Sequence, residues 1–140
     1  QLTSNHGWNT QIHANFLKDV VAMFKRQQIR TSIFIDASPE MAEGAKNIGA
    51  DRVELYTEPY ATQYNTNRTE AIRNFIQTAQ FCKEIGLGLN AGHDLSLDNL
   101  QFYHKNIPWT DEVSIGHALI CDALFYGLKD TIQKYLDCLK

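Results

Sequence analysis

A strand followed by a helix recurs four times along this chain, and this repetition constrains the fold more than any other feature. Short apolar runs predict strands at residues 31–35, 52–56, 87–91 and 112–115. No hairpin turn signal separates any two of them. Such alternation predicts a parallel sheet, in which right-handed crossovers place every loop that follows a strand on the same face.

Helical spacing of apolar residues predicts helices at residues 11–28, 38–48, 69–85, 118–126 and 128–139, with a short amphipathic stretch at 97–104. In the first helix the predicted inward stripe is Ile12, Phe16, Val20 and Phe24, widened by Leu17 and Val21. In the last it is Leu128, Ile132, Tyr135, Leu136 and Leu139. Residues 57–67, rich in Tyr, Thr and Asn, predict a long polar loop.

Two parallel architectures compete for this pattern. A doubly wound sheet normally opens with a G-x-G-x-x-G phosphate loop, which this sequence lacks. A (β/α)8 TIM barrel needs about 250 residues, so four units in 140 residues are about half of one. The short helix after the last strand favours the barrel, because barrels often bind phosphate there. Residues 1–140 are therefore predicted to be the C-terminal half of a single barrel domain, with two unpaired sheet edges.

Composition excludes several classes of partner. With a net charge of -3, the chain lacks the excess of basic residues that is typical of nucleic-acid-binding proteins. No apolar run approaches the roughly 18 to 20 residues that cross a membrane. The three cysteines are widely spaced, which predicts reduced, buried thiols rather than disulfides. No group of His, Cys, Asp or Glu has the spacing of metal ligands, so no metal site is expected.

His93 and Asp94 follow the third predicted strand directly after Gly92. A strand end fixes such side chains while the loop exposes them. An imidazole can give or take a proton near neutral pH, so His93 is a candidate general acid or base. The alternative is a loop histidine that only hydrogen-bonds its neighbours. Asp94 could orient His93 or cap the following turn.

Glu54 lies in the middle of the second strand, between Val53 and Leu55. A carboxylate there is costly unless it is paired or faces a polar cavity. Strand alternation puts Arg52, Glu54 and Tyr56 on one face, which favours a charge stabiliser in the barrel interior. The alternative is that Arg52, or a lysine on a helix, neutralises Glu54 on the outer side.

Gly116 and His117 open the helix after the last strand. Free backbone N–H groups and the helix dipole attract an anion there, and glycine lets a ligand approach the backbone. The alternative is a plain helix cap. Thr3 provides a hydroxyl in a loop that the topology places on the same face. Because loops contain many hydroxyls, its residue type alone is weak evidence for a binding role.

Four blocks of sequence closely resemble the pyridoxine 5'-phosphate synthase family. They are residues 32–37 (SIFIDA), 49–57 (GADRVELYT), 90–95 (NAGHDL) and 113–118 (VSIGHA). They follow one another in the family's order and match its second half. The resemblance implies a cytoplasmic TIM barrel that assembles as a homo-octamer and uses no metal or organic cofactor.

The activity implied by the resemblance joins 3-amino-2-oxopropyl phosphate to 1-deoxy-D-xylulose 5-phosphate. Ring closure then gives pyridoxine 5'-phosphate, inorganic phosphate and water. His93 falls on the family's proton donor and Glu54 on its transition-state stabiliser. Gly116, His117 and the backbone at Asp94 fall on the aminoketone phosphate site, and Thr3 on a contact to the deoxyxylulose phosphate.

The family's remaining acid-base groups and an arginine clamp belong to its first strands. The resemblance therefore implies that this chain alone is inactive and needs the N-terminal half of the barrel, as a separate chain or as further sequence. Two alternative functions are another phosphate-binding barrel enzyme, of the isomerase or aldolase type, and a non-catalytic phosphate-binding half-barrel. An aldolase would want a Schiff-base lysine on a strand, and no predicted strand has one.

Overall fold

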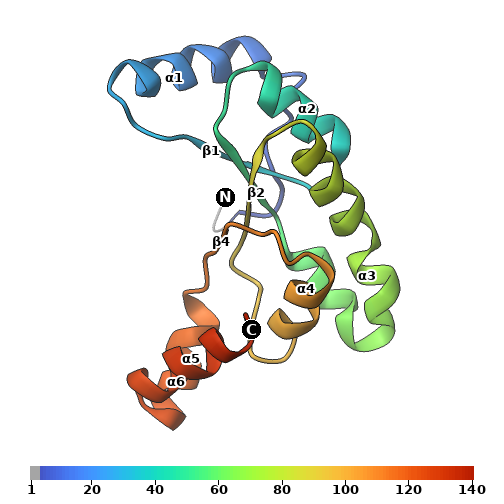
Figure 1. Cartoon of the computed structure of the whole chain (residues 1–140), viewed down its shortest axis with the longest axis vertical. Helices are drawn as coiled ribbons and strands as arrows, with labels where there is room; N and C mark the ends of the chain where they lie inside the picture. Colours follow the sequence, from blue (N-terminus) through green and yellow to red (C-terminus); the bar gives the residue numbers. More distant parts are fainter. Residues whose placement is uncertain (1–3) are drawn as a thin grey trace.

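The computed structural model describes residues 4–140, which form an α/β fold on a sheet of four parallel strands (Figure 1). These are β1 (Ser32–Ile35), β2 (Arg52–Leu55), β3 (Gly88–Ala91) and β4 (Glu112–Val113). They pair in chain order, β1-β2-β3-β4. The predicted parallel sheet is confirmed, although β4 is shorter than its predicted span.

The same part of the chain forms the helices α1 (Ala14–Arg26), α2 (Pro39–Asn47), α3 (Glu58–Glu84), α4 (Leu100–Asn106), α5 (His117–Tyr126) and α6 (Leu128–Asp137). Pro39 takes the first position of α2, where its missing N–H costs no helical bond. Gly127, with a φ of 78°, separates α5 from α6, as the sequence predicts. Figure 1 shows α5 and α6 as a pair that stands apart from α2 and α3.

The two faces of the sheet differ in chemistry. One is apolar and lies against α2 and α3; its buried side chains include Ile33, Ile35, Val53, Leu55 and Leu89. The other, here called the polar face, carries Phe34, Glu54, Asn90 and Glu112 at one level, because these four are register partners. The alternation predicted for β2 is confirmed, and it places Glu54 on the polar face rather than among the helices.

The prediction of a polar loop at residues 57–67 is wrong, because α3 begins at Glu58 and is interrupted only at Asn67, with φ -156° and ψ 86°. Tyr60 explains the extra helical turns. Its side chain is fully buried and its hydroxyl donates a 2.7 Å hydrogen bond to the carbonyl of Asn99. A polar-looking segment is thereby fixed to the core by one aromatic residue.

Two apolar stripes predicted to point inward are largely exposed, and here the prediction is wrong. In α1, Leu17 and Val21 are buried, but Phe16 and Phe24 are exposed, as is Ile12 just before the helix. In α6, Tyr135 is buried, but Leu128, Ile132 and Leu136 are exposed. The reason is position: α1 precedes the edge strand β1 and α6 follows the edge strand β4, so no described element covers their outer sides.

The cysteines divide by location. Cys82 is buried in α3 as predicted, Cys138 is half-buried, and Cys121 is exposed on α5, so the predicted burial is wrong for Cys121. The three thiols are free. Within residues 4–140, no helix is both long and apolar enough to span a membrane.

Candidate active site

His93 lies directly after β3, where the sequence predicts it, and its side chain is 43% exposed. Its ring centroid is 5.8 Å from that of Phe34 and 6.1 Å from that of Tyr56. Its Nε2 atom is 3.5 Å from the Asp94 carboxylate, for which the sequence leaves two roles open, orienting His93 or capping the following turn. Aromatic faces and a carboxylate therefore hold an imidazole that solvent and ligands can still reach.

The loop that carries His93 is tied down at its far end by Asn99. The Asn99 side chain accepts a 2.9 Å hydrogen bond from the Ser96 N–H and donates a 3.2 Å one to the Asp94 carbonyl. Asn99 is buried, so these bonds are shielded from water. His93 is thus mounted on an ordered loop.

Glu54 lies next to this loop. An ideal Cβ built on Gly92 would stand 2.6 Å from Glu54 Oε1, so the carboxylate occupies the space that the missing side chain leaves. Burial raises the pKa of Glu54 above its ordinary value. The charge of His93 acts in the opposite direction and that of Glu112 adds to the increase. Glu54 and His93 are therefore close enough to feel each other's charge.

In the structure, Arg52 does not neutralise Glu54. The Arg52 guanidinium is 3.3 Å from Glu112 and 3.6 Å from Asp111, and it donates a 3.0 Å hydrogen bond to Asn90 Oδ1. No ion pair to Glu54 is found among residues 4–140. The arginine serves other groups on the polar face, and Glu54 remains available to a ligand.

Replacing Gly92 by Ala tests this packing. The new methyl group displaces the Glu54 carboxylate, which can swing away because it ends a flexible side chain. Once the chain is completed with the N-terminal half that the sequence analysis expects it to need, we expect a loss of about 10- to 100-fold in kcat, since displacements near 1 Å carry such costs. In the background of Glu54→Gln the same substitution should have little further effect, because both act on one carboxylate. Steady-state kinetics of the single and double variants measure this; equal losses in both backgrounds would contradict it.

The remaining predicted site residues lie where the sequence puts them, with one exception. Gly116 is the cap residue of α5 and His117 its first residue, both exposed, and nothing lies within 4 Å of a Cβ built on Gly116. The open space suits a ligand at this helix start. Asp94 is beside His93. Thr3 lies outside the described residues.

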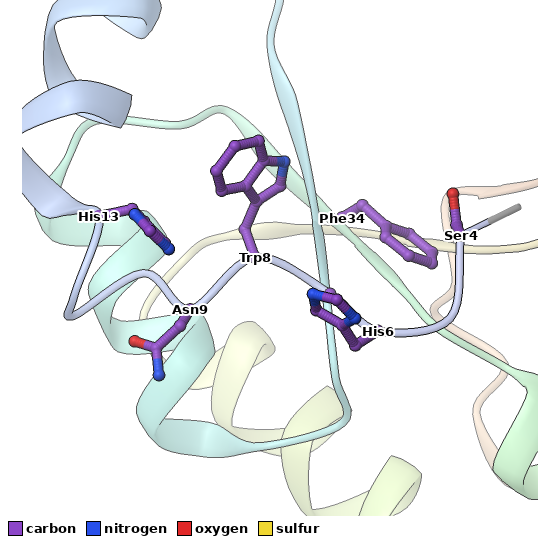
Figure 2. A pocket seen from close by; sticks show the side chains of 7 residues that line it. Ser4, His6, Trp8, Asn9, His13 and Phe34 are labelled. Atoms are coloured by element: carbon purple, nitrogen blue, oxygen red, sulfur yellow. The ribbon is translucent and has the colours of Figure 1, made fainter. Parts of the chain in front are cut away.

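The segment before α1 contributes a further pocket on the polar side of β1. It has a volume of about 340 Å³, and Figure 2 shows its lining side chains: Ser4, His6, Trp8, Asn9, His13 and Phe34. The backbone N–H of Trp8 donates a 2.7 Å hydrogen bond to the Phe34 carbonyl, which holds the segment along the edge of β1. Because the Phe34 ring also contacts His93, this pocket adjoins the candidate acid.

Some of these contacts could not be foreseen. Phe34, Asn99 and the space left by Gly92 matter only because β1, β2 and β3 are neighbours. The strand alternation does place Phe34 on one face of its strand, but nothing in the sequence pairs it with His93. Within residues 4–140 the structure holds no group of three or more His, Cys, Asp or Glu able to bind a metal ion.

Three comparisons relate the chain to known proteins. The family model described as "Pyridoxal phosphate biosynthesis protein PdxJ" matches residues 1–140. The pyridoxine 5'-phosphate synthase of Bacteroides thetaiotaomicron is 57% identical over 140 residues, which are 100% of this chain and 59% of that protein. The one of Cytophaga hutchinsonii is 58% identical over 139 residues, 99% of this chain and 58% of that protein. The chain thus spans a little under three fifths of the length of these relatives.

Among solved structures, the HMG-CoA lyase of Brucella melitensis is similar with a TM-score of 0.57 at 17% identity, covering 87% of this chain and 47% of that one. At this identity the likeness concerns the fold alone. It agrees with an α/β fold related to the TIM barrel.

Proposed function

The chain belongs to the family of the pyridoxal phosphate biosynthesis protein PdxJ, and from this premise we propose that it carries part of the active site of a pyridoxine 5'-phosphate synthase. The proposed reaction condenses 3-amino-2-oxopropyl phosphate with 1-deoxy-D-xylulose 5-phosphate and closes the ring of pyridoxine 5'-phosphate, with release of inorganic phosphate and water. The observation that carries the proposal is the juxtaposition of His93 and Glu54 on the polar face at the end of neighbouring parallel strands.

His93 acts in this proposal as the proton donor. Ring formation requires hydroxyl groups to leave as water, and a hydroxyl leaves far more readily once it is protonated. The imidazole is exposed enough to meet a substrate, while Phe34 and Tyr56 keep its ring in place. The Asp94 carboxylate lies 3.5 Å from Nε2 and is proposed to orient the ring.

Glu54 is proposed to stabilise positive charge in the transition state. Condensation of an amine with a carbonyl passes through a cationic imine, and a carboxylate fixed nearby lowers the energy of that cation. Partial burial strengthens the interaction, because water screens it less. Arg52 does not pair with this carboxylate, so the charge of Glu54 can act on the substrate.

Phosphate binding is proposed at the start of α5. The first backbone N–H groups of a helix have no intrahelical partners, and Gly116 leaves them accessible. His117 and the backbone at Asp94 complete the contact to the aminoketone phosphate. The second substrate is proposed to occupy the neighbouring pocket at Phe34 and Ser4. Thr3 is proposed as a further contact to it, from the resemblance alone.

We also propose that residues 1–140 are one part of a single TIM-barrel domain whose other strands complete the site. Two features support this: β1 and β4 are both sheet edges, and exposed apolar side chains flank each of them. The most exposed are Leu124 and Phe125 of α5, at 81% and 86%. Such surfaces also suit the contacts of a homo-octamer, which is part of the proposal. A cytoplasmic location is proposed as well.

A chimera tests the function. In it, this chain replaces the 140 matched residues of the Bacteroides thetaiotaomicron relative; it is called the chimera below. We expect the chimera to form pyridoxine 5'-phosphate from the two substrates at a rate within about tenfold of that relative, and this chain alone to form none. Phosphate binding by a folded chimera without product would instead favour the non-catalytic alternative.

A further inference from the structure

Thr57 stands at the start of α3 but does not do what a threonine there usually does. It directly follows β2 and occupies the cap position of α3, where a hydroxyl normally accepts a hydrogen bond from a backbone N–H of the first helical turn. The Thr57 side chain makes no such bond. It is nevertheless fully buried, so its hydroxyl must find partners elsewhere.

Those partners lie on both sides of His93. The Thr57 hydroxyl donates a 2.9 Å hydrogen bond to the Gly92 carbonyl and accepts a 3.2 Å hydrogen bond from the Asp94 N–H. The Asp94 carboxylate oxygen Oδ2 is also near, at 3.4 Å. A hydroxyl has one proton to donate, and the shorter contact assigns it to Gly92.

These two bonds fix the backbone that presents the imidazole. The Gly92 carbonyl and the Asp94 N–H belong to the peptide groups before and after His93, so holding both restricts rotation about the His93 backbone. Among the interactions within residues 4–140, the His93 side chain has ring contacts, a 3.5 Å approach to Asp94 and a charge interaction with Glu54. Asn99 anchors the other end of the loop through the Asp94 carbonyl.

We propose that Thr57 is a positioning residue for His93: its buried hydroxyl clamps the two peptide groups that flank the imidazole. The proposal rests on the function proposed above and assigns a task to a fully buried residue outside the proposed catalytic pair. Thr57 takes its own position from the end of β2, two residues after Leu55, whose carbonyl accepts a hydrogen bond from the Gly92 N–H. The clamp therefore makes the position of His93 depend on the register in which β2 and β3 pair.

The test uses two substitutions in the chimera. Thr57→Val keeps the shape and removes the hydroxyl. The Asp94 N–H then loses its bond to Thr57, and the Gly92 carbonyl keeps only the long 3.4 Å bond from the Leu95 N–H. We expect kcat to fall about 10- to 100-fold, with KM within about threefold, because the acid is displaced while the binding groups remain. Thr57→Ser keeps the hydroxyl and should restore kcat to within about threefold of the unsubstituted chimera.

Thr78→Val is the matched control. Thr78 is also fully buried, and its hydroxyl donates a 2.9 Å hydrogen bond to the carbonyl of Asn74 within α3, away from the loop of His93. We expect kcat of this variant to stay within twofold. A purely structural role for Thr57 predicts similar kinetics for both valine variants, and that result would overturn the proposal, as would a Thr57→Ser variant as slow as Thr57→Val.

Hydrogen–deuterium exchange separates this inference from the proposed function. In the chimera, Thr57→Val should speed exchange in the peptide that contains residues 92–95 at least about tenfold, whereas Thr57→Ser and Thr78→Val should leave it unchanged. If the unsubstituted chimera gives no product, the proposed function fails, yet faster exchange still supports the clamp. Unchanged exchange in Thr57→Val would overturn the clamp whatever the turnover.

Discussion

Replacing His93 by Asn should lower kcat of the chimera by about 10²- to 10⁴-fold, the range that a positioned general acid contributes. Asparagine keeps a polar side chain at this exposed position but has no proton to give near neutral pH. The Phe34 and Tyr56 rings would lose one stacking partner and remain packed on each other, at 5.5 Å between centroids. The fold should therefore survive, and a thermal unfolding curve checks this.

The matched control for this substitution is His104→Asn. His104 is a half-buried residue in the last turn of α4, and it has no part in the proposed chemistry. Its replacement should leave kcat within twofold. Phosphate binding should persist in both variants, because the start of α5 is untouched. Unchanged turnover in His93→Asn would remove this residue from the mechanism.

Replacing Glu54 by Gln should lower kcat by about 10²- to 10³-fold, the cost of losing one preorganised group that stabilises transition-state charge. The amide keeps the size of the carboxylate but not its charge. The pH dependence gives a second measure. Because the pKa of Glu54 is raised, chiefly by burial, its carboxylate takes up a proton at a higher pH than an ordinary glutamate as the pH falls.

The acid limb of the kcat profile should therefore lie above the ordinary glutamate range in the unsubstituted chimera. It should lose that component in Glu54→Gln, which does not titrate. Glu84→Gln, on the exposed end of α3, is the control and should change neither kcat nor the profile. A profile that is the same with and without the Glu54 carboxylate would contradict the assigned role.

Local patterns sufficed to predict the sheet and the positions of its polar side chains. Glu54 could be assigned to the middle of a strand and His93 to a strand end, because alternation and glycine punctuation depend on neighbouring residues alone. The same holds for α5 and α6, which Gly127 separates in the sequence as in the structure. Such features are set by residues that lie close together in the chain.

Tertiary contacts decided what the sequence mispredicted or left out. The segment at 57–67 is polar by composition, yet burial of Tyr60 against the core makes most of it helical. Thr57 looks like a helix cap, and only the neighbouring loop after β3 diverts its hydroxyl to Gly92 and Asp94. The apolar stripe of α1 predicts burial, but no described element lies beyond the edge strand β1 to cover its outer side.

Product release by the chimera tests the central claim most directly, namely that His93 and Glu54 of this chain carry the ring-forming chemistry. The measurement follows pyridoxine 5'-phosphate and inorganic phosphate in one reaction with both substrates. We predict equal amounts of the two products, with both rates falling by the same factor in His93→Asn. Phosphate released without pyridoxine 5'-phosphate, or equal rates with and without His93, would contradict the account.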